Sequence, residues 1–177
     1  MRFLGSAIAA ILLSMGLPCG FAMAASSGDP TAEPANWEIF RGLEGEWHSD
    51  GTAFGRPAKL TMSWEPALDQ EFFHIRYRIE PKGAASRIFE GVGFYRPLGN
   101  GQHEGTWFDS GGEMHHIAAS DDGMALTSFW GVPGEKYGRT VYRMLESGAL
   151  EVVDAIETKD GAWKEFSRNL FERAQTN

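Results

Sequence analysis

Histidine side chains are the first candidates for metal or acid–base chemistry, because imidazole is a common metal ligand and titrates near neutral pH. The chain contains five histidines: His48, His74, His103, His115 and His116. Neighbouring residues on a strand point to opposite faces, so His115 and His116 are poorly placed to hold one ion together. None of the five has a partner at the spacing of a known zinc site. The sequence therefore predicts no metal centre.

Acidic and glycine-rich runs are the next candidates for a site. Asp109–Glu113 and Asp121–Gly123 lack the ligand spacing of a calcium loop and are more typical of hairpin turns. Ser110 lies in no Gly-x-Ser-x-Gly motif, and Gly91-Val92-Gly93 has neither the third glycine nor the following helix of a nucleotide-binding loop. We therefore predict no catalytic residues and no cofactor.

Aromatic residues supply the remaining candidate site. The sequence holds six Trp, four Tyr and twelve Phe, and small-molecule sites are mostly apolar with a few polar groups. We predict that a ligand cavity is lined by Met62, Trp64, Ile75, Tyr77, Ile79, His116, Trp130 and Tyr142. Tyr77 would supply a hydroxyl group, and His116 an imidazole if its strand turns that face inward. A completely filled core is the alternative, because small barrels can have either interior.

Four further residues, two apolar and two basic, test the same pattern. Met124 and Leu126 are predicted on the interior face with Trp130. Arg139 and Arg143 lie in the same segment as Tyr142 but alternate onto the opposite face, so we do not expect them to join Tyr142 around a carboxylate.

Alternation of polar and apolar residues predicts the elements that position these side chains. In Phe73–Glu80 every odd position is apolar and every even position polar, which is typical of a strand with one dry face and places His74 on the polar face. Leu60–Glu65 and Leu150–Glu157 repeat the pattern. Turn sequences rich in Gly, Pro and Asp delimit the expected strands. These span residues 45–54, 57–66, 70–80, 86–96, 103–109, 113–119, 124–130, 137–145, 149–157 and 162–172.

The predicted fold class is all-β, an antiparallel up-and-down barrel of about 8–10 strands. A short helical turn from Asn36 through Leu43 precedes it. A meander of this many strands leaves exposed edges unless it closes into a barrel. An immunoglobulin-like sandwich is the alternative fold, but it has fewer strands and longer connections.

The N-terminus predicts export. Arg2, the apolar run Phe3–Leu17 and the small residues of Ala22-Met23-Ala24 are typical of a signal peptide over residues 1–24. An uncleaved anchor is disfavoured by the short apolar run, and a lipoprotein signal by the proline before Cys19. Residues 25–35 are predicted to be a flexible tether, and residues 36–177 a single barrel domain. We expect a periplasmic or secreted protein with no membrane span after cleavage.

Charge and cysteine content exclude several partners. The formal net charge is −8, and removal of Arg2 makes the mature part still more acidic. Such a chain has no electrostatic footprint for nucleic acid or an anionic membrane surface. Cys19 is the single cysteine, so no disulfide is expected after cleavage. The sequence does not indicate an oligomeric state.

Two resemblances rest on local motifs. Gly45-Glu46-Trp47, preceded by a helical turn, resembles the first strand of lipocalins and other calycins. That resemblance implies a tryptophan that plugs one end of the barrel beneath a late arginine, either Arg168 or Arg173. The segments Gly91–Tyr95, Gly105–Gly111 and Gly138-Arg139 resemble an uncharacterised bacterial family of small lipocalin-like barrels.

These resemblances imply a fold more than an activity. The nitrobindin-like haem barrels are similar in architecture, but they place their haem ligand near the C-terminus, and the last histidine here is His116. Our leading hypothesis is an exported lipocalin-like binding protein for a small, mainly apolar ligand. An enzyme that uses the same cavity, such as an isomerase or hydrolase, and a packed barrel that acts through its surface are the alternatives.

Overall fold

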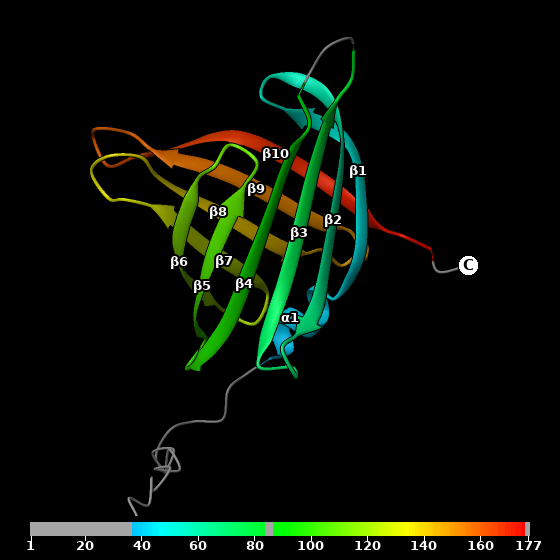
Figure 1. Ribbon diagram of the computed structural model, residues 1–177, viewed down its shortest axis with the longest axis vertical. Helices are drawn as coiled ribbons and strands as arrows, with labels where there is room; N and C mark the ends of the chain where they lie inside the picture. Colours follow the sequence, from blue (N-terminus) through cyan, green and yellow to red (C-terminus); the bar gives the residue numbers. More distant parts are fainter. Residues whose placement is uncertain (1–36, 84–86, 176–177) are drawn as a thin grey trace, which may run out of the picture. The chain divides into compact units, whose positions relative to one another are not determined.

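The computed structural model describes residues 37–83 and 87–175, which form a closed antiparallel up-and-down barrel (Figure 1). The predicted signal peptide (1–24) and tether (25–35) lie outside these residues. The elements are α1 (Glu38–Leu43), β1 (Gly45–Ala53), β2 (Arg56–Ala67), β3 (Phe72–Pro81), β4 (Phe89–Gly99), β5 (Gln102–Asp109), β6 (Met114–Asp121), β7 (Ala125–Gly131), β8 (Tyr137–Met144), β9 (Leu150–Glu157) and β10 (Trp163–Arg173). The predicted fold class is confirmed, and the alternative sandwich is wrong.

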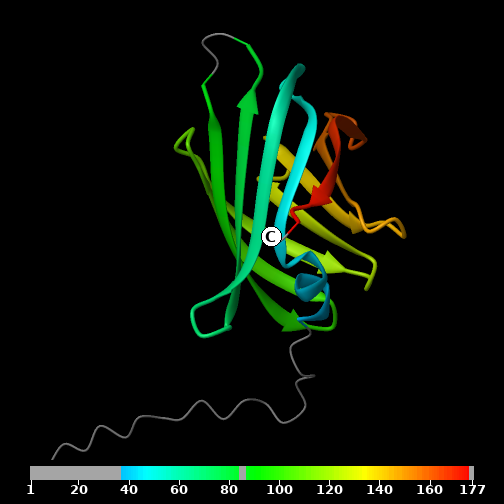
Figure 2. The same ribbon diagram turned by 90° about the vertical axis from the view of Figure 1, so that its right-hand side faces the viewer.

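The order of the strands around the barrel is the order of the strands in the sequence. Each strand pairs with its neighbours in sequence, and β1 closes the ring against β10. Successive strands therefore run in opposite directions, and their turns gather at two ends of the barrel. Helix α1 lies at one of them, beside the start of β1 (Figure 2). We call this the helix end and the opposite one the far end.

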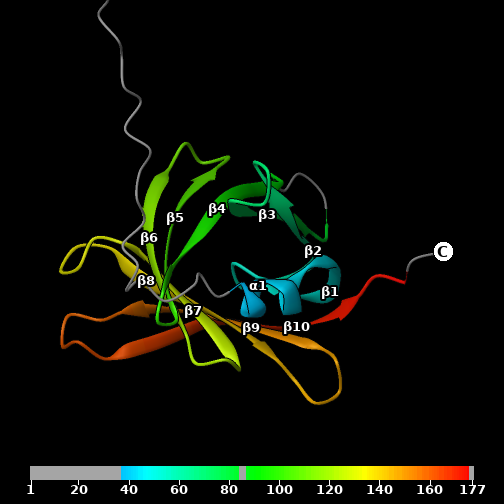
Figure 3. The same cartoon turned by 90° about the horizontal axis from the view of Figure 1, so that it is seen from below.

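Helix α1 lies at the helix end beside β1, as Figure 3 shows from below. Three residues of α1 are buried, Ile39, Phe40 and Leu43. Trp47 is fully buried beneath them, and its indole Nε1 donates a hydrogen bond to the Leu43 carbonyl at 2.8 Å. This bond ties the last turn of the helix to the strand that comes after it.

The arginine predicted over this tryptophan is Arg173. Its guanidinium lies 4.2 Å from the centre of the Trp47 ring, a cation–π contact. Its Nη2 donates to the Gly42 carbonyl at 3.0 Å, so one side chain covers the tryptophan and caps the helix. Arg168 instead forms ion pairs with Glu151 and Glu165. The calycin-like closure is therefore made by the second of the two candidates.

The part of the barrel nearest α1 is filled by aromatic rings. Trp64 lies 5.3 Å, centre to centre, from both Tyr95 and Tyr142, and Phe40 packs against Trp64 and Tyr95 from below. Ile75 is fully buried in the same cluster. This packed layer is the floor on which any interior space must rest.

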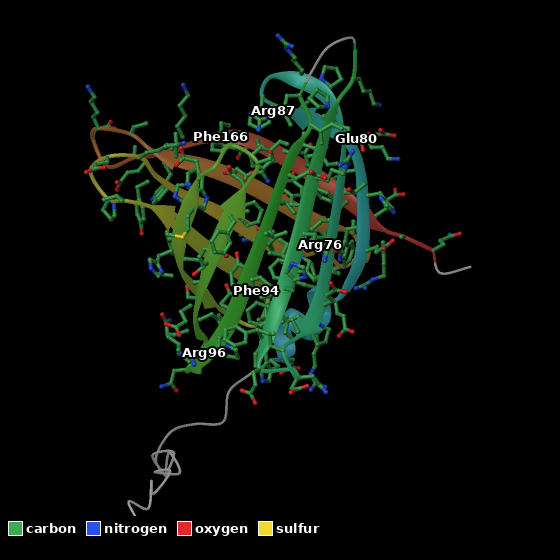
Figure 4. All side chains as sticks on the ribbon, in the orientation of Figure 1. Arg76, Glu80, Arg87, Phe94, Arg96 and Phe166 are labelled. Carbon is green, nitrogen blue, oxygen red and sulfur yellow. The ribbon has the colours of Figure 1, made fainter. Side chains whose placement is uncertain are left out.

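Two expectations about faces need correction. Met124 is 71% exposed, because it lies in the turn before β7, where Asp122 accepts hydrogen bonds from the Met124 and Ala125 amides. His74 does lie on the outer face, but it is only 8% exposed. The ring of Phe94 stacks on it at 4.7 Å. Figure 4 shows Phe94 between Arg76 and Arg96 over the outside of β3 and β4.

Candidate functional site

A cavity of about 480 Å³ lies inside the barrel. It reaches the surface at the far end, where Phe54 and Phe166 line it while being 67% and 54% exposed. We define the mouth as six of the lining residues at that end. They are Phe54, Phe89, Asp109, Lys136, Lys164 and Phe166. The cavity thus has one packed floor and one accessible mouth.

Two tryptophans form flat walls because glycines lie beneath them. A Cβ atom at Gly91 would be 1.9 Å from Cζ2 of Trp107, and one at Gly138 would be 2.2 Å from Cζ2 of Trp130. Any side chain there would displace the indole toward the cavity. The glycines at these two inward positions of β4 and β8 therefore set the width of the space, as close approaches of this kind require.

Hydroxyl groups lie in the lower part of the wall. The Tyr95 hydroxyl is 3.1 Å from Ser128 Oγ, and both residues line the cavity with Tyr142. Burial raises the pKa of Tyr95 to about 12 and raises the pKa of Tyr142 well above its ordinary value. These phenols therefore stay neutral at physiological pH and act through hydrogen bonds.

Asp154 provides a carboxyl group inside the cavity. Its Oδ1 accepts a hydrogen bond of 2.7 Å from the Thr140 hydroxyl, which in turn accepts one of 3.2 Å from the Trp130 indole. Burial raises the pKa of Asp154, and hydrogen bonds from Thr140 and Ser167 oppose that rise. An ionised carboxylate can accept about four hydrogen bonds, so two such bonds leave Asp154 with acceptor capacity toward the cavity.

Tyr77 presents a second polar group from a different wall. It lies on β3, and among the described residues its hydroxyl has no hydrogen-bond partner. Burial, and then the carboxylate of Asp154, raise the pKa of Tyr77 above its ordinary value. The lining of the cavity therefore includes both an unpaired phenol donor and an incompletely used carboxyl acceptor.

The predicted site residues divide into three groups. The first group lines the cavity: Met62, Tyr77, Ile79, Trp130 and Tyr142. Trp64 and Ile75 lie beneath it in the packed layer. His116 is exposed on the outer face, beside a surface hollow with Phe94 and Phe129. Its strand does not turn that face inward, so the condition attached to its role is not met. Ligand contact by the residues that line the cavity stays a prediction.

Sequence reasoning missed several lining residues, among them Trp107, His115, Thr140 and Asp154. Signals for two of these were present. Asp154 lies at the one polar position in the inward series Leu150, Val152, Asp154, Ile156. His115 shares its strand face with the apolar Ile117, whereas His116 does not.

The arginines on β8 point away from the interior, as predicted. Arg143 is exposed, and the Arg139 guanidinium lies 4.6 Å from the ring of Trp163, while Tyr142 is buried. No arginine lines the cavity among the described residues. The polar groups available to a bound molecule are therefore hydroxyls, carboxyls, one imidazole and the two lysines of the mouth.

Comparison with known proteins does not assign the chain to a family. No protein-family model matches the chain, and no curated protein matches it. In residues 37–83 and 87–175, no cluster of three or more histidine or acidic side chains has metal-site geometry, and no helix is long and apolar enough to span a membrane. The geometry and chemistry of the cavity are therefore the basis for assigning a function.

Proposed function

We propose that this protein binds a small, mainly apolar molecule inside its barrel. The observation that carries the proposal is the cavity itself, a space of about 480 Å³ with aromatic and aliphatic walls and one mouth. Ligand pockets usually measure roughly 300–1,000 Å³ and combine apolar walls with a few polar groups. The volume and the wall chemistry both favour a single small ligand.

The cavity favours binding over the two alternatives. A packed barrel that acts only through its surface needs no interior space. An enzyme needs convergent groups, yet among the described residues His115 and Asp154 form no hydrogen bond or ion pair with each other. The nearest acidic group paired with His115 is Glu113, at 3.9 Å. A general base must reach the proton that it removes, and no such pair is assembled in the described part of the cavity.

We also propose that the protein is exported to the periplasm or the medium and belongs with the small lipocalin-like bacterial barrels. The apolar leader before Ala24 supports export. The motifs that contain Gly91 and Gly138, together with the closed barrel, support the family. The intact mass of the exported protein should correspond to a chain beginning at Ala25. A product that keeps residues 1–17 would contradict export.

The proposal is tested by filling the cavity. Val152 lines it, whereas its neighbour Val153 belongs to the outward face of the same strand. Val152→Phe should weaken binding of the neutral probe N-phenyl-1-naphthylamine, measured by its fluorescence, because the added ring takes up part of the space and narrows the cavity. Val153→Phe adds the same volume outside and should leave binding unchanged. Circular dichroism checks that both variants fold.

Equal effects of the two substitutions on binding would contradict an interior site. So would a wild-type protein that binds no probe.

A further inference from the structure

We propose that the cavity orients its ligand, with a hydroxyl or amine group bound at Asp154 and Tyr77 and any carboxylate held at the two lysines of the mouth. This inference rests on the proposed function and specifies which ends of a ligand the site accepts. Its basis is the placement of the charges and unpaired polar groups in the cavity.

Asp154 lies halfway along β9, between the mouth and the packed layer. Its strand neighbours across the ladders are Thr140 on β8 and Ser167 on β10. Thr140 fixes the position of Oδ1 through a 2.7 Å hydrogen bond, and Thr140 is itself held by the indole of Trp130. Asn169 donates a 3.1 Å hydrogen bond to Ser167 Oγ on the other side. The carboxyl group is therefore held in place before a ligand arrives.

Tyr77 makes this a two-sided site. It reaches the cavity from β3, which does not neighbour β9 in the ring, and the charge of Asp154 acts on its hydroxyl. A hydroxyl group on a ligand can donate to Asp154 and accept from Tyr77 at the same time. An ammonium group can donate to Asp154, with the stronger bond that two opposite charges give.

A carboxylate on a ligand would be unfavourable close to Asp154, where an ammonium group is favourable. It would have to lose its water next to a carboxyl group, with no arginine among the described lining residues to compensate. Lys136 and Lys164 do line the cavity, but they lie in the turn before β8 and near the start of β10, at the mouth. Acidic ligands are therefore expected to enter with their apolar ends first and leave their carboxylates at the lysines.

The test uses three ligands of equal chain length: decylamine, 1-decanol and decanoate. Each is titrated as a competitor of N-phenyl-1-naphthylamine at about pH 7.5. At this pH a free amine is protonated and a free carboxyl group is ionised. Asp154→Asn keeps an acceptor for Thr140 but removes the charge. This substitution should lower the affinity for decylamine by about tenfold or more and the affinity for 1-decanol by less. The affinity for decanoate should change by less than about twofold. Tyr77→Phe, which removes only a hydroxyl, should weaken 1-decanol more than decanoate.

The lysines give the complementary result. The double variant K136M/K164M should lower the affinity for decanoate several-fold and leave the affinity for 1-decanol unchanged. Glu151→Gln, on the outer face of β9, and Lys159→Met, outside the cavity lining, are the matched controls and should change none of the three affinities.

The failures can be told apart. If Asp154→Asn changes all three affinities equally, or none, while the naphthylamine probe still binds, the orientation is wrong and the binding function stands. If neither the probe nor any of the three ligands binds the wild-type protein, the proposed function itself is wrong.

Discussion

Asp154 shows at the scale of one residue how the cavity changes ionisation. Solvent-exposed aspartate ionises near pH 3.8, and burial raises the pKa of this one above that value. The unfolded chain therefore loses the proton at a lower pH than the folded chain does. Between these two pKa values the folded state binds more protons, so its stability falls as the pH rises. Keeping an acid inside the barrel has a cost that is absent at low pH.

Replacing Asp154 with Asn should remove that pH dependence. Each unit by which the folded pKa exceeds 3.8 corresponds to about 1.4 kcal/mol of stability lost above the folded pKa. The free energy of unfolding of the wild type, measured in urea, should therefore decline relative to Asp154→Asn from about pH 4 upward. Asp109→Asn, at the mouth, serves as a comparison. A difference between wild type and Asp154→Asn that grows in the opposite direction would contradict the raised pKa.

At the scale of elements, the closure of the helix end depends on one tryptophan. Trp47 on β1 joins α1 through its bond to the Leu43 carbonyl and joins β10 through Arg173. The register of β1 against β10 is short and consists of the pairs Trp47↔Arg173 and His48↔Glu172. The short pairing of β1 with β10 is therefore reinforced by the contact between the Trp47 and Arg173 side chains at the helix end.

Trp47→Ala should destabilise the protein by about 3–5 kcal/mol, as large-to-small changes in a core do. Trp163 is the matched control, because it also carries an arginine over its ring but lies partly exposed on the outer face. Trp163→Ala should cost clearly less in the same denaturation experiment. A loss below about 1 kcal/mol for Trp47→Ala would show that the closure does not depend on this side chain.

The elements themselves were predictable because each carries its own signal. Alternation in Phe73–Glu80 and the Asp-Gly turns define strands locally, so the ten predicted strands agree with the ten observed to within a few residues. β4 is an exception. It begins at Phe89 rather than residue 86 and continues past Pro97 through a register shift between Pro97 and Gly99. Such an irregularity depends on the neighbouring strand, which a local pattern does not contain.

The cavity was less predictable than the barrel. Alternation tells which residues face inward, but whether an inward residue lines empty space or packed core depends on how far it lies from α1. Trp64 and Tyr77 share one kind of position in the sequence, yet Trp64 packs against Phe40 of the helix and Tyr77 lines the cavity. The indole rings of Trp107 and Trp130 each lie over a glycine on the adjacent strand. Which glycine lies under which tryptophan is known only once the register of the strands is known.

At the scale of the whole molecule, the barrel combines a filled half and a hollow half. The packed layer beneath the cavity supplies the stability, since the aromatic rings of Phe40, Trp64 and Tyr95 are almost fully buried there. The hollow half leaves apolar walls without partner atoms, which costs stability that a bound molecule would return. This division is what a protein requires if it is to stay folded when empty and gain stability on binding.

The most direct test of an interior binding site is a titration of the folded mature protein with neutral aromatic probes of increasing size while tryptophan emission is recorded. Trp107 and Trp130 line the cavity, so we expect quenching that saturates at one probe per protein. We also expect it to disappear for probes too large for a space of about 480 Å³. Tryptophan emission that stays unchanged with probes of every size would show that the barrel is not a receptor for an interior ligand.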